Sequence, residues 1–437
     1  QIKYDIPIFI FFRALGIETD KDIIQYIVSD ENDTEMIKIL DNSITDAEKL
    51  KIYKQSDALD YLSKYTITVP KNTEDVNIKR AFVMNTLETE MLPHLGKSIP
   101  KKCYFIGHMV NKLLSTYIGR EKLDDRDHYG NKRVELAGTL LSQLFRDSFR
   151  RLTREIKINL QREINQDGYG KILNVKDNIS KIFKASTIDN TIKYSLATGN
   201  WGIKTMNMRQ GVAQMFARLT FIGSVSQLRR LNTQVEKSGK IIPPRKLHSS
   251  QWGYICPSET PEGGSVGLVK NLALMQYITS NMNPSPVILA LNNLGMIDLL
   301  SEEITPANMN TFTKIFVNGR WFGIHPDPIN LYKILKTAKQ KAVINIFTSI
   351  VFNIDTNEIV IFTDSGRCCR PLHIVDDRNI RIRKSHIHRI QDGSFKWRNL
   401  LFGSNRDIES ECDDDDASRG VIEYIDTEEL ENCLVAE

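Results

Sequence analysis

The sequence predicts a multidomain protein of mixed α+β architecture, rich in helices up to about residue 232 and rich in strands beyond residue 265. Three observations support this prediction. The chain has 437 residues, more than one hydrophobic core usually serves. Apolar residues recur at the three-to-four spacing of core-facing helices in the first part. Short apolar runs separated by turn residues dominate the second part.

The first 124 residues predict a helix-rich domain. The apolar run IPIFIFF (6–12) is short, and we interpret it as a buried strand. A short helix is expected after Thr19 and Asp20, and an amphipathic one over 79–93, stopped by Pro93. Residues 103–119 predict a further helix with one core-facing side. That side comprises Ile106, Met109, Val110, Leu113, Leu114 and Tyr117.

A charged, glycine-containing joint, DDRDHYGNKR (124–133), indicates a domain boundary, and the strongest predicted helix follows over 134–164. Its apolar stripe is Leu136, Leu140, Leu144, Phe149, Leu152, Ile156 and Leu160. Basic side chains cover its other faces, and a solvated surface is favoured over a nucleic-acid contact. They are Arg146, Arg150, Arg151, Arg154, Lys157 and Arg162.

A second helical block is predicted from 185 to about 232, interrupted by the loop TGNWG (198–202). Its last segment, 209–232, repeats apolar residues at helical spacing. Residues 233–246 follow as a loop with one glycine, two prolines and four basic residues.

The remainder predicts strands. The four segments are 287–300, 314–326, 358–375 and 421–436. Asn318 and Gly319 are typical of a tight hairpin turn, and TDSG (363–366) indicates a second turn. His386 and His388 would share one face of a possible strand, but two imidazoles make no metal site. The acidic run CDDDD (412–416) is interpreted as a solvated loop.

Charge is concentrated in one part of the chain. The formal net charge is +4, yet residues 201–250 contain nine basic residues and one acidic residue, Glu236. The rest of the chain is therefore net negative. A basic block in an otherwise acidic protein indicates a polyanion that contacts one domain, and neutralisation of phosphates is the chemistry that suits it.

Bulk features exclude several classes of protein. No run of 18 apolar residues is present, so we expect no transmembrane helix. The six cysteines form no CxxC pair and have no zinc spacing, which favours reduced, intracellular thiols. The chain starts at Gln1 without a visible leader, and both ends suggest a piece of a longer polypeptide.

The stretch LHSSQWGYICPSETPEGG (247–264) concentrates reactive side chains. A nucleophile pair of Cys256 and His248, or an acid–base pair of Glu259 and Glu262, is a weaker interpretation than a rigid turn. Pro261 presets the backbone and the following glycines permit left-handed conformations. Standard phosphate-cradling motifs and two-metal carboxylate clusters are both missing from the sequence. The residues alone therefore predict a nucleic-acid-binding fragment without catalytic residues or bound metal.

Two tryptophans flank the basic block. Trp201 and Trp252 could stack on bases, but core packing is the favoured interpretation for each.

Several motifs together resemble the second-largest subunit of multisubunit DNA-directed RNA polymerases, of the eukaryotic and archaeal rather than the bacterial type. They are TGNW (198–201), SQLRRLNT (226–233), PRKLHSSQWG (244–253) and CPSETPEG followed by GLVKNLAL (256–274). Further matches run in order along nearly the whole chain, including DDRDHYGNKR (124–133) and GVIEYID (420–426). The isoleucine-, asparagine- and lysine-rich usage fits a large DNA virus, an archaeon or a divergent eukaryote.

The resemblance implies four domains: part of the lobe (1–124), the second part of the protrusion (125–184), the fork (185–266) and a β-rich external region (267–437). It implies nucleic-acid contacts in the fork, beside the active centre, where DNA strands separate and the RNA–DNA hybrid lies. The implied contact residues are Lys204, Arg209, Arg229, Arg230, Lys237, Lys240, Arg245, Lys246 and His248. The implied wall of the active centre is Glu259, Thr260, Pro261, Glu262 and Gly263.

The resemblance places the chemistry outside this chain. In the family, the largest subunit holds the catalytic Mg²⁺, so this fragment is not expected to be catalytic alone or to bind a cofactor. Any zinc of the subunit would lie outside residues 1–437. The implied partners are the largest and smaller polymerase subunits, template DNA, the hybrid and transcription factors, with no membrane. The location is intracellular: nucleus or cytoplasm, or a virus factory or virion for a viral gene. The alternative is a stand-alone single-stranded nucleic-acid-binding or helicase-accessory module.

Overall fold

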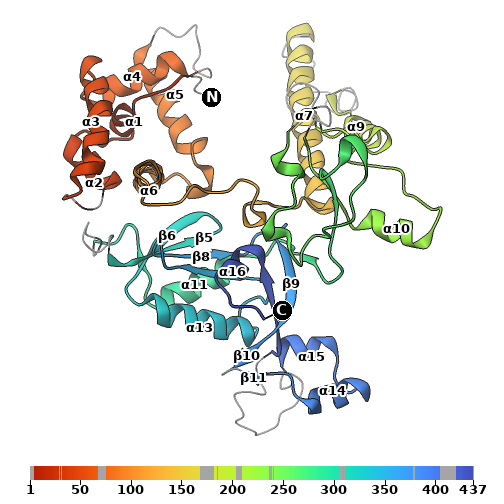
Figure 1. The fold of residues 1–437 in the computed structure, drawn as a ribbon. Helices are drawn as coiled ribbons and strands as arrows, with labels where there is room; N and C mark the ends of the chain where they lie inside the picture. The colour runs from red at the N-terminus through yellow and green to blue at the C-terminus, as the bar shows by residue number, and fades with distance from the viewer. Residues whose placement is uncertain are drawn as a thin grey trace. The chain divides into compact units, whose positions relative to one another are not determined.

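A computed structural model describes all residues except 1–3, 29, 31, 67–74, 168–181, 185, 203–208, 236–238, 240, 303, 305–308, 310, 377–378, 404–419 and 437. The described chain divides into two compact units (Figure 1). The first comprises 1–126, 281–364 and 371–437, and the second comprises 127–280 and 365–370. The predicted division into four domains stays a prediction.

The first unit begins with six helices around one apolar core. They are α1 (Ile8–Ala14), α2 (Asp20–Ile27), α3 (Thr34–Lys49), α4 (Gln55–Tyr65), α5 (Val76–Thr89) and α6 (Ile99–Ile118). The predicted start of α2 is confirmed, because the Thr19 side chain accepts a hydrogen bond from the backbone N–H of Asp22. The amphipathic helix predicted over 79–93 is confirmed as α5, but it ends at Thr89 rather than at Pro93.

The prediction of a strand at residues 6–12 is wrong, because this run begins helix α1. Phe9, Ile10 and Phe12 are all fully buried, so the segment is surrounded by core on several sides. A short apolar run has the same appearance in a buried helix and a buried strand, and the neighbouring helices decide between them. The guanidinium of Arg13 donates to the carbonyl of Ile52 and pairs with Asp20, which satisfies the one charge in this helix.

Helix α6 is confirmed, but its predicted core face is partly wrong. Ile106 and Leu114 are buried, whereas Met109, Leu113 and Tyr117 are exposed. The buried side is rotated towards Cys103 and His108, because α6 packs both on the helical core and near the strands of the same unit.

A five-stranded sheet forms the rest of the core of the first unit, in the order β4-β6-β5-β8-β7. The strands are β4 (Ile297–Asp298), β5 (Thr313–Val317), β6 (Arg320–His325), β7 (Ser349–Asn353) and β8 (Glu358–Phe362). Among the described strands of this sheet, β5 and β8 are parallel and the other neighbouring pairs are antiparallel. The predicted hairpin at Asn318–Gly319 is confirmed, with φ angles of 50° and 75° that suit its tight turn.

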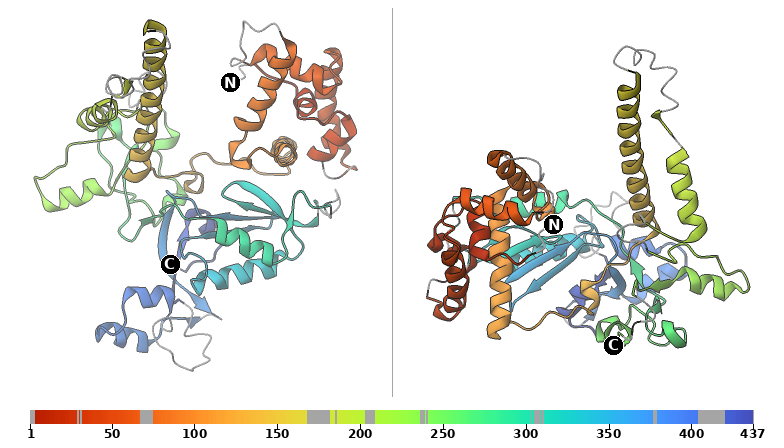
Figure 2. Two further views of the ribbon diagram at one scale, coloured as in Figure 1. Left: turned by 180° about the vertical axis from the view of Figure 1, so that it is seen from behind. Right: turned by 90° about the horizontal axis from the view of Figure 1, so that it is seen from above.

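Two helices cover one face of this sheet, α11 (Ser285–Asn293) and α13 (Pro328–Gln340) (Figures 1 and 2). The strand predicted over 287–300 is therefore mostly wrong: its first half is α11, and only β4 is extended. Pro284 and Pro286 flank the helix start, where proline is tolerated because the first N–H groups have no partner within a helix. Tyr104 and Phe105 of α6 pack against Phe316 and Trp321 of the sheet.

The remaining elements of this unit are short. They are β10 (Val375–Asp376), β11 (Asn379–Ile380), α14 (Lys384–Gln391), α15 (Trp397–Phe402), β12 (Ile422–Asp426) and α16 (Thr427–Glu431). His386 and His388 lie in helix α14, so their predicted placement on a strand is wrong. The predicted strand at 421–436 is confirmed only for β12. The acidic run 412–416 lies outside the described residues.

The second unit is built around the long helix α7 (Ala137–Asp167), with α9 (Ser186–Thr198) beside it (Figure 2). Leu144 and Leu152 of the predicted stripe are buried, while Phe149 and Leu160 are exposed. Strands β1 (Arg230–Asn232) and β2 (Val269–Asn271) form an antiparallel ribbon. Strand β3 (Tyr277–Ile278) pairs with the start of β9 (Cys368–His373).

The continuous helix predicted over 209–232 is reduced to α10 (Phe221–Leu228). Gly211 has a φ of 69° and the N–H of Val212 donates to the carbonyl of Gly199, which holds the preceding segment in a non-helical path. The Thr220 side chain then caps the helix by accepting from the N–H of Gly223. In the part of the chain that the structure describes, no helix has the length and apolar character needed to cross a bilayer.

Candidate nucleic-acid interface

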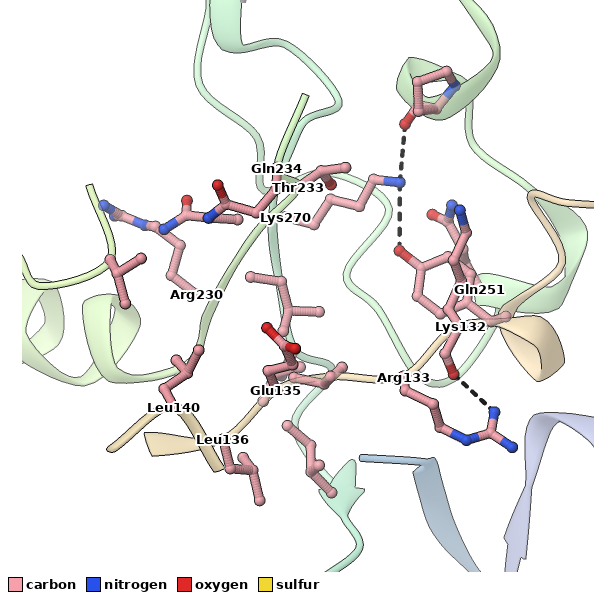
Figure 3. Close-up of a pocket in the computed structure, with 18 of the residues that line it drawn as sticks. Lys132, Arg133, Glu135, Leu136, Leu140, Arg230, Thr233, Gln234, Gln251 and Lys270 are labelled. Atoms are coloured by element: carbon pink, nitrogen blue, oxygen red, sulfur yellow. Dashed lines mark hydrogen bonds between the residues drawn. The ribbon is translucent and has the colours of Figure 1, made fainter. Parts of the chain in front are cut away.

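A cavity of about 630 Å³ lies within the second unit (Figure 3). Segments from four parts of this unit line it, namely 127–140, 209–212, 228–234 and 243–278. Its cationic lining residues are Lys132, Arg133, Arg209, Arg230, Lys246 and Lys270. Asp127 and Glu135 are its two carboxylates, and leucines such as Leu136, Leu140 and Leu231 make part of its wall. Positive charge therefore exceeds negative charge in a concave, partly apolar site.

Lys270 is the most deeply placed of these cations. Its residue is only 9% exposed, and its ammonium donates to the hydroxyl of Tyr129 at 3.4 Å and to the carbonyl of Pro244 at 3.2 Å. Figure 3 shows this ammonium between its two partners. Burial, and then the charge of Lys132, lower the pKa of Lys270. Strand pairing explains its position, because Lys270 of β2 lies opposite Leu231 of β1.

The carboxylates of the cavity pair with two of its cations. Glu135 forms an ion pair with Arg209, and Asp127 lies 3.8 Å from Lys132. Arg133 donates to the carbonyls of Gly130 and Lys132. Within the described ranges, no carboxylate forms an ion pair with Lys270, Arg230 or Lys246.

The basic residues predicted as nucleic-acid contacts have different environments. Arg209, Arg230, Lys246 and His248 line the cavity. Arg229 instead turns its guanidinium to the backbone carbonyls of Ala273 and Leu274. Three further predicted contacts, Lys204, Lys237 and Lys240, lie outside the described residues.

Arg245, near the end of the predicted basic loop (233–246), is hydrogen-bonded to the turn at residues 264–267, which begins at the last residue of the motif CPSETPEGG. Its guanidinium donates to the carbonyls of Gly264 and Val266 at 2.8 and 2.9 Å. Thr260 reinforces the turn, because its hydroxyl donates to the carbonyl of Val269 and accepts from the N–H of Gly267. These bonds hold Arg245 against the turn, with its guanidinium donating to backbone carbonyls.

The residues predicted to form an active-centre wall lie on the surface. Glu259, Thr260, Pro261, Glu262 and Gly263 are all exposed. The Glu259 carboxylate accepts a hydrogen bond from the Ser226 hydroxyl at 2.5 Å, and its carbonyl accepts from the Asn271 amide. Glu259 thus ties the turn to helix α10 and strand β2, while the turn itself is exposed in the described chain.

His248 has a structural position at the start of a 3₁₀ turn, Ser249–Gln251. Its Nδ1 accepts from the backbone N–H of Ser250, and it lies 2.7 Å from the Ser250 hydroxyl. Cys256 donates its backbone N–H to the carbonyl of Asn271. Among the described residues, no group of three or more His, Cys, Asp or Glu side chains is placed to hold a metal ion.

The two tryptophans differ. Trp201 is buried and its indole N–H donates to the carbonyl of Leu140, which confirms core packing. Trp252 is 59% exposed, so the prediction that it packs in the core is wrong. It lines a smaller cavity of about 300 Å³ with Leu247 and Pro257.

Lys132, Arg133 and Lys270 were not among the predicted contact residues, although all three line the cavity. They fall outside the window 201–250 in which the charge was counted. A signal was present: Lys132 and Arg133 belong to DDRDHYGNKR, and Lys270 belongs to GLVKNLAL. The pairing of β1 with β2 is what places Lys270 beside residues of the basic block 201–250.

Models of three protein-domain families match the chain in order. "RNA polymerase Rpb2, domain 2" matches residues 1–135, "RNA polymerase Rpb2, domain 3" matches 214–278 and "RNA polymerase Rpb2, domain 4" matches 315–376. The residues that line the cavity fall in or between the first two of these matches.

Curated proteins similar to the chain are polymerase subunits. The DNA-directed RNA polymerase II subunit 2 of Arabidopsis thaliana is 42% identical over 446 residues, covering 100% of this chain. Subunit RPB2 of polymerase II from Encephalitozoon cuniculi is 40% identical over 100% of the chain. Subunit RPC2 of polymerase III from Drosophila melanogaster is 32% identical over 99%. The chain spans about a third of these relatives, 35%, 36% and 36% of their lengths.

Proposed function

The chain belongs to the family of second-largest subunits of DNA-directed RNA polymerases, and we propose that it forms the part of such a subunit that contacts nucleic acid beside the active centre. One observation carries this proposal: cations from several segments converge on the concave surface of the second unit. Phosphate contacts need cations at defined positions and no recognition of bases. The role we assign to this surface is support of DNA strand separation and of the RNA–DNA hybrid during template-directed RNA synthesis.

The nucleotidyl transfer itself is assigned to the assembled enzyme. Of the carboxylates discussed above, Glu259 accepts a hydrogen bond from Ser226 and Glu135 is paired with Arg209. Catalytic Mg²⁺ would come from the largest subunit, and the exposed turn Glu259–Gly263 would face the active centre. The proposed partners are the largest and smaller subunits, template DNA, the hybrid and transcription factors, in the nucleus or the cytoplasm.

Similarity over the whole chain favours this role over a stand-alone nucleic-acid-binding module. Copurification provides a test. A stoichiometric partner that carries a Mg²⁺ site supports the proposal, whereas a stable monomer with full activity in cells would contradict it.

A sharper test uses Arg230→Ala and Lys246→Ala in the assembled polymerase, because neither cation has an ion-pair partner in the described chain. Each loss of a charge-assisted contact should shorten the lifetime of the open DNA complex by about tenfold. Lys333→Ala is the control, since Lys333 is an exposed lysine of α13 in the other unit. Unchanged open-complex lifetime and elongation rate in both variants would rule out the assigned role.

A further inference from the structure

Lys270 is a buried cation with neutral partners. More than nine-tenths of its surface is inaccessible, yet the described chain supplies no carboxylate to its ammonium, only the oxygens of Tyr129 and Pro244. An ammonium has three N–H donors, and the described residues supply acceptors to two of them. Burial of a charge without a counter-charge is unfavourable, and such a group is therefore a candidate for ligand binding.

The charges around Lys270 indicate that its ligand is negatively charged. Arg230 and Lys246 line the same cavity and have no carboxylate partner among the described residues, and Lys132 lowers the pKa of Lys270 further. Asp127, the carboxylate with an electrostatic effect on Lys270, is already shared with Lys132. An anion that enters the cavity would meet several cations at once.

We propose that the cavity is a phosphoryl-binding site in which Lys270 holds a phosphoryl oxygen and Lys132, Arg230 and Lys246 neutralise the remaining charge. A phosphoryl group offers several anionic oxygens and can accept from more than one cation at a time. The volume of about 630 Å³ and the leucine wall leave room for more than a bare phosphate. The group belongs either to a nucleic-acid strand or to a free nucleotide. This inference deepens the proposed function and rests on it for the strand source.

The test measures thermal stabilisation of the 437-residue chain by two probes: a 12-nucleotide single-stranded DNA without terminal phosphate, and inorganic tripolyphosphate. A ligand that binds only the folded state raises the melting midpoint. Stabilisation by the DNA identifies a strand as the source, and stabilisation by tripolyphosphate alone identifies a nucleotide. In either case, Lys270→Met should weaken binding about tenfold, because a charge-assisted bond is lost.

Three further variants control the interpretation. Lys333→Met removes the same charge from an exposed site and should leave both stabilisations unchanged. Lys132→Met, at a half-buried position, should weaken binding even where Lys270→Met fails to fold. Lys270→Arg keeps the charge and should retain binding of at least one probe. Without any anion, Lys270→Met should melt no lower than the wild type, whereas a purely structural lysine would lower the midpoint.

Two results would overturn the phosphoryl site. In the first, both probes stabilise the wild type and Lys270→Met equally. In the second, neither probe stabilises either protein. That failure is separable from failure of the proposed function. DNA binding that survives Lys270→Met but is lost in Arg230→Ala contradicts the Lys270 site and leaves the polymerase role intact. Stabilisation by tripolyphosphate in a chain that never assembles with polymerase subunits would support the site and contradict the role.

Discussion

Gly267 lies where the turn after CPSETPEGG touches the basic loop. Its φ is 68°, and a Cβ atom at this position would lie 2.2 Å from the carbonyl oxygen of Arg245. We predict that Gly267→Ala destabilises the second unit by about 2 kcal/mol or more, because left-handed strain and a backbone clash act together. Chemical unfolding measures this effect.

Gly264→Ala is the matched control for Gly267→Ala. It lies three residues away in the same turn, and a Cβ there would meet no atom within 4 Å. We expect a change of about 0.5 kcal/mol or less. Equal destabilisation by both variants would show that the contact with Arg245 is not the cause.

His108 is a buried histidine that remains neutral. Burial first, and then the charges of Lys314 and Lys112, lower its pKa to about 2 from an ordinary 6.5. Its Nε2 lies 3.4 Å from the Glu358 carboxylate, and Lys314 lies 3.5 Å from its Nδ1. Since burial, reinforced by the two lysine charges, keeps the ring uncharged, the approach to Glu358 is a neutral contact rather than an ion pair.

The stability that neutral His108 contributes is complete above pH 6.5 and is lost as the pH falls towards 2, because only the unfolded chain takes up the proton in that window. Each pH unit corresponds to about 1.4 kcal/mol. We predict that His108→Gln reduces the loss of stability between pH 6.5 and pH 5, measured by unfolding at both values. His373→Gln, at an exposed histidine, should leave that loss unchanged, and the same loss in His108→Gln would refute the prediction.

Helix α13 and the C-terminal elements β12 and α16 are held together by a buried ion-pair network. Lys339 lies 2.8 Å from the Glu429 carboxylate and 3.1 Å from that of Glu423, and Lys336 also pairs with both. We predict that Glu429→Gln destabilises the first unit by about 3 kcal/mol, because Lys339 keeps a buried charge with a weaker partner.

The double variant Lys339→Met with Glu429→Met should be less damaging than Glu429→Gln alone. It removes both charges together, and well-packed apolar replacements of a buried pair are often close to neutral. Denaturant unfolding of the single and double variants gives the comparison. If the double variant is less stable than the single one, the network stabilises the fold by more than the mutual neutralisation of buried charges.

Among the helices and strands, the sequence predicted correctly those marked by a local signal such as a cap or a turn. The predictions were wrong where packing against neighbouring elements determines the secondary structure. Thr19 marked the start of α2, and Asn318–Gly319 marked the hairpin, because both act locally. The run 6–12 became a helix because α1 is packed on several sides, which no local pattern reports. Helix α10 is short because Gly211 and Thr220 hold the chain before it, and its exposed Phe221 shows that apolar periodicity need not mean burial within this chain.

The same distinction applies to the candidate site. Counting charges between 201 and 250 found Arg230 and Lys246, since both lie in the basic block itself. It missed Lys270 and Lys132, because β-strand pairing and the joint at 124–133 bring them to the cavity from distant positions. It also predicted Arg245 as a nucleic-acid contact, and this stays a prediction; in the structure the guanidinium donates to the carbonyls of Gly264 and Val266.

The whole molecule combines a net charge of +4 with a strongly basic second unit, so its nucleic-acid affinity should depend on salt. We predict that single-stranded DNA binds the 437-residue chain with a slope of log affinity against log salt of about −3, as four phosphate contacts would give. The four contributing cations would be Lys132, Arg230, Lys246 and Lys270. Fluorescence anisotropy between 50 and 200 mM salt, roughly the range in which such binding weakens most visibly, measures the slope.

Removal of one contact should then change the slope by a defined step. Lys246→Ala should make it shallower by about 0.7, because one fewer counterion is released, while Lys333→Ala should leave it unchanged. Both variants carry the same net charge, so the comparison separates a positioned contact from a general electrostatic attraction. If the two slopes change equally, the long-range field of the chain, rather than the cavity, governs binding.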